Sequence, residues 1–309
     1  MKSGSRLEAI LEQGLFAVTG ECGPPRGTDV GIVRKKAAHL RGFVDAVNVT
    51  DNQTSIVRMS SIAASKILLD EGLEPVMQMV CRDRNRIAMQ SDLFGASALG
   101  IRNMLCLSGD HQKFGNHPGA KNVYDVDSIQ LIGIVRTLRD EGKLQSGDEV
   151  QGRPPMFIGA AENPFADPFD FRVIRLAKKV AAGVDFIQTQ CIYDMGKFKR
   201  FMQQVVDRGL DEKVHILAGV TPLKSLAMAN YMARNVSGIE IPPELIERIK
   251  AAPKEKRSDE GIRICVEQIQ ELRELPGIHG IHLMAIEWEE KVAEIVRAAG
   301  LLPRPAVEP

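Results

Sequence analysis

The stretch from Leu15 to Arg26, LFAVTGECGPPR, joins a short apolar segment to an acidic side chain and a glycine–proline cluster. Residues 15–18 favour a β-strand, whereas Gly23-Pro24-Pro25 cannot continue a sheet ladder. Glu21 is therefore expected where the strand ends. A carboxylate at that point is either a loop acid paired with Arg26 or a general acid, because catalytic side chains collect at strand ends in parallel α/β folds.

Three further polar side chains follow other apolar segments, namely Thr50, Asp110 and Gln190. If the strands are parallel, these side chains meet Glu21 at one end of the sheet. Two acids, an amide and a hydroxyl suit a polar heterocycle that needs hydrogen bonds and a proton. They suit a metal poorly, because His282 lies within its predicted strand and is expected to be a core residue.

A basic group consists of Arg172, Arg175 and Lys179, which are spaced i, i+3 and i+7. This spacing places all three on one face of a predicted helix. The face is either an ordinary solvated surface or a clamp for the phosphate of a cofactor that lies over the strand ends.

Apolar strand-like segments alternate with helical patterns along the whole chain. The predicted strands cover residues 15–18, 46–50, 75–81, 104–107, 156–161, 186–192, 216–221 and 281–285. The predicted helices cover residues 30–40, 60–70, 84–98, 127–140, 169–182, 196–208, 225–234, 243–250, 259–274 and 287–299. The longest irregular stretch, 111–125, is expected to be functional.

Eight such units in 309 residues, with no linker, predict an α/β protein that is a single (β/α)8 TIM barrel over residues 1–309. A doubly wound sheet is disfavoured because no GxGxxG follows the first strand.

The amino-acid composition argues against nucleic-acid binding, a metal site and a membrane span. The chain has 40 basic and 40 acidic residues and only 15 aromatic ones, from 11 Phe, 3 Tyr and 1 Trp, so nucleic-acid binding is not expected. Its five cysteines are dispersed without a CxxC pair, which predicts a reduced protein with no metal site. Without a signal peptide or an apolar run of membrane-spanning length, a cytoplasmic protein with no membrane span is expected.

In order and spacing, a series of short motifs resembles the methylenetetrahydrofolate reductase family, a family of flavin-dependent (β/α)8 barrels. The motifs are Glu21-Cys22-Gly23-Pro24-Pro25-Arg26, Val49-Thr50, Gly109-Asp110, Tyr124 with Asp127, Lys179 with Gly183, Thr189-Gln190, Gly219-Val220-Thr221-Pro222 and Ile241-Pro242. Each motif alone is weak, but together they extend over residues 15–288.

The resemblance implies a role for each site residue. Glu21 would protonate the bridging nitrogen of the folate, Asp110 would lie beside the flavin and the pterin, and Gln190 would bind the pterin. A hydride from reduced flavin would then give 5-methyltetrahydrofolate. The implied flavin contacts are Thr50, Gln78, Ser108, Gly109, Asp110, Tyr124, Ala160, Asn163, Arg172, Arg175 and Lys179, and the implied substrate contacts include Leu226 and Trp288.

Several positions depart from the family pattern. Gln78 replaces a flavin-contacting histidine, Ser108 an arginine and Ala160 a tyrosine, and Arg172 and Arg175 replace an aspartate and an asparagine that hold the distal part of FAD. Both FAD and FMN therefore stay open as cofactors.

The substrate side departs as well. Leu226 stands where an aromatic ring stacks on folate and nicotinamide, and Trp288 stands where an arginine contacts substrate. This pattern is similar to reductases of anaerobes and acetogens, so an electron-donating partner subunit is expected, with a homo- or a hetero-oligomer left open. Two other classes stay open, a pterin-binding methyltransferase barrel without flavin and a non-enzymatic docking barrel.

Overall fold

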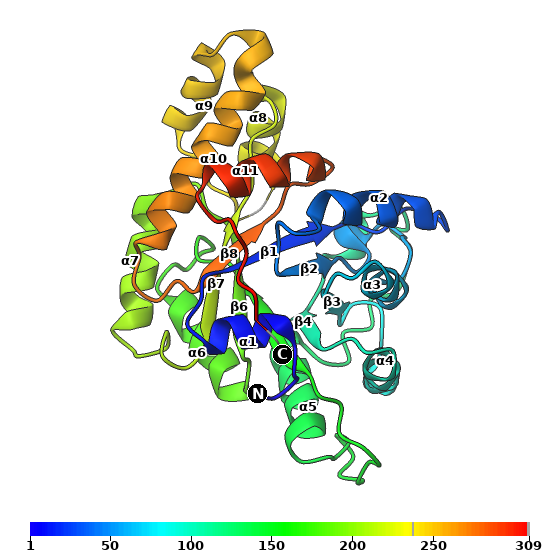
Figure 1. The fold of residues 1–309 in the computed structure, drawn as a ribbon. Helices are drawn as coiled ribbons and strands as arrows, with labels where there is room; N and C mark the ends of the chain where they lie inside the picture. Colours follow the sequence, from blue (N-terminus) through cyan, green and yellow to red (C-terminus); the bar gives the residue numbers. More distant parts are fainter. Residues whose placement is uncertain (237, 308–309) are drawn as a thin grey trace.

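A closed barrel of eight parallel strands forms the centre of the protein (Figure 1). The computed structural model describes residues 1–236 and 238–307. The strands are β1 (Ala17–Cys22), β2 (Ala46–Val49), β3 (Pro75–Val80), β4 (Asn103–Leu107), β5 (Phe157–Glu162), β6 (Phe186–Cys191), β7 (His215–Val220) and β8 (Gly280–Leu283). Each strand pairs with the next, and β1 closes the barrel against β8. The predicted (β/α)8 barrel is confirmed.

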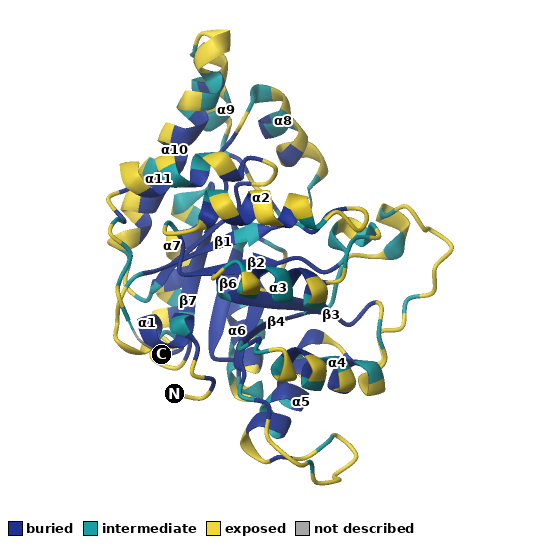
Figure 2. Ribbon diagram, turned by 45° about the vertical axis from the view of Figure 1, so that its right-hand side comes forward, coloured by how far each residue is buried: buried dark blue, intermediate teal, exposed yellow. Residues whose placement is uncertain are grey.

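Helices follow the strands and cover the outside of the barrel. They are α2 (Val30–Leu40), α3 (Ser61–Asp70), α4 (Arg86–Ala98), α5 (Ser128–Asp140), α6 (Phe171–Ala182), α7 (Met195–Val206), α8 (Leu226–Asn235), α9 (Pro243–Ala251), α10 (Arg257–Arg273) and α11 (Val292–Ala298). Figure 2 shows buried strands inside and helices whose outer faces are exposed. Helices α8, α9 and α10 extend beyond the barrel, where they share a small apolar core.

One helix, α1 (Arg6–Glu12), was not predicted. Leu7, Ile10 and Leu11 on this helix pack against the first inward-facing residues of the strands, including Ala17 and Phe157. The helix therefore closes the amino-terminal end of the barrel. At only seven residues it is too short to give a clear helical pattern in sequence.

A stacked aromatic pair fills the barrel interior near the amino-terminal ends of the strands. The rings of Phe157 and Phe186 lie 5.0 Å apart, centroid to centroid. Gly159 makes room for this stack, because a Cβ atom there would lie 2.3 Å from the Phe186 ring. The stack occupies the part of the barrel interior next to α1, and the cavity described below lies toward the carboxyl ends of the strands.

Some predicted boundaries need correction. β1 begins at Ala17 rather than at residue 15, and Leu15 is 37% exposed. α4 begins at Arg86 rather than at residue 84, because the Asn85 side chain accepts the backbone N–H groups of Ile87 and Ala88. The last helix begins at Val292, after a 3-10 turn over Glu289–Lys291, rather than at residue 287.

Among the described residues, no helix has the length and apolar character needed to span a membrane.

Candidate active site

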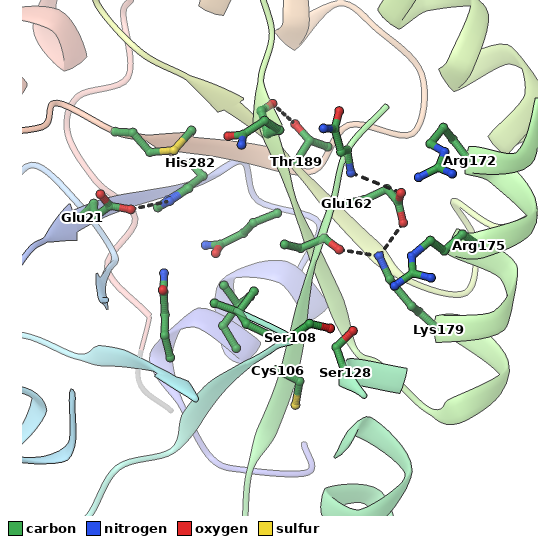
Figure 3. Close-up of a pocket in the computed structure, with 18 residues that line it drawn as sticks. Glu21, Cys106, Ser108, Ser128, Glu162, Arg172, Arg175, Lys179, Thr189 and His282 are labelled. Carbon is green, nitrogen blue, oxygen red and sulfur yellow. Dashed lines mark hydrogen bonds and ion pairs between the residues drawn. The ribbon is translucent and has the colours of Figure 1, made fainter. Parts of the chain in front are cut away.

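An open cavity of about 390 Å³ lies at the carboxyl ends of the strands (Figure 3). Eight of the predicted site residues line it, which places groups far apart in sequence around one space. These residues are Glu21, Gln78, Ser108, Asn163, Arg172, Arg175, Lys179 and Gln190. Its volume lies within the range of small-molecule and cofactor sites.

Glu21 projects from the end of β1 into this cavity, and its side chain is 11% exposed. It also lines a second cavity of about 180 Å³, which it shares with Arg26, Lys36 and Arg58. Oε2 of Glu21 lies 3.7 Å from Nε2 of His282 on β8. The Glu21 carboxylate is therefore largely buried, lies between two cavities and has a histidine as its neighbour.

His282 was expected to be a core residue, and the structure places it on the wall of the main cavity. Its Nδ1 atom lies 3.0 Å from Oγ1 of Thr19, which in turn accepts from the side-chain amide of Gln188. Gln188 also pairs reciprocally with Asn48. The sequence analysis missed this polar layer. A usable signal was the i, i+2 spacing of Thr19 and Glu21 and of Gln188 and Gln190, since alternate strand residues face the same side.

Gln190 is the other predicted substrate contact that lines the main cavity. Its Oε1 atom accepts the backbone N–H of Cys191 at 3.1 Å. The amide nitrogen is thus the group of this side chain that is available to a ligand, as a hydrogen-bond donor.

The three basic residues of α6 lie opposite Glu21 and His282 (Figure 3). Lys179 is buried, and its Nζ atom donates to Oε2 of Glu162. Burial lowers the pKa of Lys179, and the positive charges of Arg175 and Arg172 act in the same direction, against the pull of Glu162. Lys179 is therefore already paired with a carboxylate, unlike the two arginines with which it was predicted to form a phosphate clamp.

Arg172 and Arg175 line the same cavity, and neither has a carboxylate partner among the described residues. Arg172 uses its Nε atom for a 3.4 Å contact with the carbonyl of Pro168. Two unpaired guanidinium groups on one wall favour an anionic ligand group, because arginine binds phosphate in a bidentate manner.

Thr50 and Asp110 were predicted to meet Glu21 at the strand ends, but neither lines the two cavities that Glu21 borders. Thr50 is buried outside the lining of both cavities, and its hydroxyl has no hydrogen-bond partner among the described residues. Asp110 is exposed, and its Oδ2 accepts the backbone N–H of Thr54 at 3.1 Å. After Gly109, whose φ is +90°, the chain turns toward the loop that follows β2.

Two other predicted flavin contacts also lie outside the main cavity. The Tyr124 hydroxyl donates to the carbonyl of Gly109 at 3.3 Å, and the side chain is 39% exposed. Ala160 is buried in the core around the barrel, whereas its neighbour Ala161 lines the cavity. The alternation of strand side chains explains this one-residue difference.

Leu226 and Trp288, the two departures on the substrate side, line neither cavity. Leu226 is the first residue of α8 and packs on the small core of the extension. Trp288 is 6% exposed and belongs to the main core, with Nζ of Lys224 5.5 Å from its ring centroid. Among the described residues that line the main cavity, there is no Phe, Tyr or Trp.

The described residues contain no group of three or more His, Cys, Asp or Glu side chains arranged as metal ligands. The five cysteines are buried thiols, and burial raises the pKa of Cys22 and Cys81 to about 12. Cys106, which lines the main cavity, is buried as well, and burial raises the pKa of its thiol well above the usual range. A thiol with so high a pKa is a poor nucleophile.

Comparisons with known proteins point to one family. A family model described as methylenetetrahydrofolate reductase matches residues 6–300. Methylenetetrahydrofolate reductase 2 of Schizosaccharomyces pombe is 27% identical over 262 residues, which cover 79% of this chain and 38% of the yeast protein. The 5,10-methylenetetrahydrofolate reductase of Salmonella typhimurium is 24% identical over 234 residues, which cover 75% of this chain and 72% of that protein.

The chain spans only part of several of these relatives, between 36% and 44% of the length of four eukaryotic reductases. Among solved structures, an uncharacterised protein from Clostridium thermocellum, described as binding two copies of 5-methyl-5,6,7,8-tetrahydrofolic acid, aligns with a TM-score of 0.63 and 14% identity. The alignment covers 97% of this chain and 99% of that one. At this level of identity, the likeness shows the fold.

Proposed function

Because the chain belongs to the methylenetetrahydrofolate reductase family, we propose that it reduces 5,10-methylenetetrahydrofolate to 5-methyltetrahydrofolate with a bound flavin. One observation carries this proposal beyond the family match. Glu21, the carboxylate at the end of β1, lines the same cavity as the amide of Gln190 and the two unpaired arginines of α6. An acid, a pterin-binding amide and an anion clamp thus surround one space.

Glu21 is the general acid in this proposal. It carries the proton that goes to the bridging nitrogen of the folate, which opens the five-membered ring and leaves a reactive iminium carbon. A positioned acid typically contributes a factor of ~10²–10⁴ to the rate. Its place between two cavities gives Glu21 access to substrate, while its 11% exposure limits contact with water.

The lining of the main cavity fits a flavin. Gln78 and Ser108 offer an amide and a hydroxyl at the ends of β3 and β4, and Asn163 follows β5. These neutral groups suit the polar edge of an isoalloxazine ring, and Arg172 and Arg175 suit a phosphate. A bound reduced flavin would supply the hydride for the iminium carbon.

The direct electron donor is proposed to be a partner protein rather than NADH or NADPH. A nicotinamide must lie flat against the flavin for hydride transfer, and an aromatic wall helps to hold it. The described lining of the main cavity contains no Phe, Tyr or Trp side chain.

The experiment that tests the proposed function is the visible spectrum of the purified chain after incubation with FAD or FMN and gel filtration. We expect a yellow protein whose released cofactor is identified by mass and whose bleached form converts methylenetetrahydrofolate into methyltetrahydrofolate. A colourless protein that still binds methyltetrahydrofolate would favour the methyltransferase alternative. A protein that binds neither ligand would contradict both.

A further inference from the structure

A chain of hydrogen-bonded polar side chains lies inside the barrel beneath Glu21. Its members are almost completely buried, with 0% exposure for Thr19 and Asn48, 2% for Gln188 and 4% for His282. Buried polar groups are stable only when they are paired, so the orientation of each member is constrained by the others.

The constraint begins at Gln188. Nε2 of Gln188 donates to Oδ1 of Asn48 at 3.0 Å, and Nδ2 of Asn48 donates back to Oε1 of Gln188 at 2.5 Å. In this reciprocal pair, the nitrogen of the Gln188 amide is the donor and its oxygen is the acceptor. Nε2 also donates to Oγ1 of Thr19 at 3.0 Å, so the Thr19 hydroxyl is an acceptor there and has its own proton left to donate.

Two atoms lie within reach of the Thr19 hydroxyl proton, a backbone carbonyl oxygen and a ring nitrogen that accepts only in one tautomer. Nδ1 of His282 is 3.0 Å from Oγ1, and the carbonyl oxygen of Ile281 is 3.4 Å from it. The shorter contact makes Nδ1 the better acceptor. A neutral imidazole that accepts at Nδ1 carries its hydrogen on Nε2, and Nε2 is the atom that faces Glu21.

We propose that His282 is a positioning residue for Glu21, with Thr19 and Gln188 selecting its Nε2–H tautomer. The inference rests on the proposed function of Glu21 as the general acid. The Nε2–H group holds Oε2, which leaves the proton on Oε1 for the substrate nitrogen. When that proton leaves, the same donor stabilises the carboxylate that forms.

The present separation of Nε2 and Oε2 is 3.7 Å, somewhat longer than a hydrogen bond. Catalytic hydrogen bonds commonly tighten only when substrate is bound. Both side chains line the same cavity, and we expect bound substrate to shorten their separation.

Other charged groups line the two cavities that Glu21 borders. On the side of the second cavity, Lys36 is paired with Glu287 and Glu289, and Arg26 and Arg58 line the same space. Across the main cavity, Lys179 is paired with Glu162, and Arg172 and Arg175 lie beside them. Among the described residues, His282 is the ion-pair partner within 4.0 Å of the Glu21 carboxylate.

The first test is spectroscopic and does not require turnover. Long-range ¹H–¹⁵N correlation spectra of the ¹⁵N-histidine-labelled full chain report which ring nitrogen of each neutral histidine carries hydrogen, and His282→Gln assigns the relevant signal. We expect His282 in the Nε2–H form, retained in Thr19→Ser and lost or mixed in Thr19→Val. An Nδ1–H form in the unaltered protein, or a tautomer indifferent to Thr19→Val, would overturn the inference.

The second test is the pH profile of the reduction of 5,10-methylenetetrahydrofolate. His282→Leu should lower kcat by about 10- to 100-fold, the size expected for loss of a hydrogen bond to a charged group, with KM for folate nearly unchanged. The alkaline limb of the kcat/KM profile should move to higher pH, because the carboxylate loses its donor. His282→Gln, which keeps an N–H group, should recover part of the rate.

A matched control is His215→Gln, at the start of β7 and away from both cavities. It should leave the rate and the pH profile unchanged. Normal rates and profiles in both His282 variants would sink the positioning role while the proposed function stands. If the unaltered protein does not reduce methylenetetrahydrofolate, the result counts against the proposed function instead. The NMR measurement would still show whether Thr19 and Gln188 select the Nε2–H tautomer of His282.

Discussion

Nζ of Lys179 donates to Oε2 of Glu162 across the boundary between α6 and β5, and both side chains are at most 4% exposed. This pair couples a helix to the strand on which it packs, at the edge of the main cavity. It also neutralises the lysine, so the positive charge offered to a ligand comes from Arg172 and Arg175.

Breaking this pair should destabilise the fold. Glu162→Ala leaves a buried ammonium group without its carboxylate partner, and we expect the free energy of unfolding to fall by about 3–5 kcal/mol in urea titrations. The double variant Glu162→Gln with Lys179→Met should recover much of the loss. Glu271→Ala is the matched control, because Glu271 pairs with Lys199 at the exposed surface. A loss no larger than that of the control, about 1 kcal/mol or less, would contradict the assignment.

The two arginines should hold the phosphate of the cofactor. We expect Arg175→Ala to retain much less flavin than the unaltered protein after gel filtration, because one of the two unpaired guanidinium groups in the cavity is removed. Lys199→Ala, which removes an exposed cation from α7, should retain flavin normally. Equal flavin occupancy in the two variants would show that Arg175 does not bind the phosphate of the cofactor.

NADH and NADPH should be poor direct reductants of the isolated chain. Stacking on an aromatic ring is worth roughly 0.5–1.5 kcal/mol beyond area burial, or about tenfold in affinity at most. Trp288 does not provide an aromatic surface for the nicotinamide, because its ring is buried in the main core. Stopped-flow bleaching of the oxidised flavin by NADH, NADPH and reduced viologen measures the effect. Fast, saturable bleaching by either nicotinamide would restore it as the donor.

Acid should destabilise the protein partly through His215. Burial, with a contribution from His279, lowers the pKa of His215 to about 4 from its ordinary 6.5. Because this pKa is depressed on folding, the unfolded chain takes up the proton first as pH falls from 6.5 toward 4. The associated loss of stability is about 3 kcal/mol at most. Unfolding titrations of His215→Gln over this range should show a shallower dependence on pH, and an unchanged slope would rule out this contribution.

Much of the fold follows from local signals in the sequence. Asp127 caps α5, with Gln130 completing a capping box, and Gly183 ends α6 with a φ of +102°. Eight alternating units, with no GxGxxG after the first strand, favoured one closed barrel over a doubly wound sheet, so the architecture was predictable. The short α1 was not, since its stability comes from packing against strand residues that lie far away in sequence.

The site was only partly predictable. The order of the strands predicts which residues lie at their carboxyl ends, but it does not predict the direction in which each side chain points. Glu21 and Gln190 line the cavity as expected, but Asp110 turns to the backbone of Thr54 after a glycine with positive φ. The partner of Lys179 lies 17 residues away in sequence, on another element. Such pairings depend on tertiary contacts that local patterns do not contain.

The central claim is that Glu21 supplies the proton for reduction of methylenetetrahydrofolate. Its most direct test is an anaerobic single-turnover reaction of the viologen-reduced, flavin-loaded protein with 5,10-methylenetetrahydrofolate, comparing the unaltered chain with Glu21→Gln and with Glu294→Gln, an exposed carboxylate of α11. We predict that the unaltered chain and Glu294→Gln form 5-methyltetrahydrofolate, whereas Glu21→Gln is reduced normally by viologen but forms product ~10²–10⁴ times more slowly. Near-normal product formation by Glu21→Gln, or no product from the unaltered chain, would contradict the account.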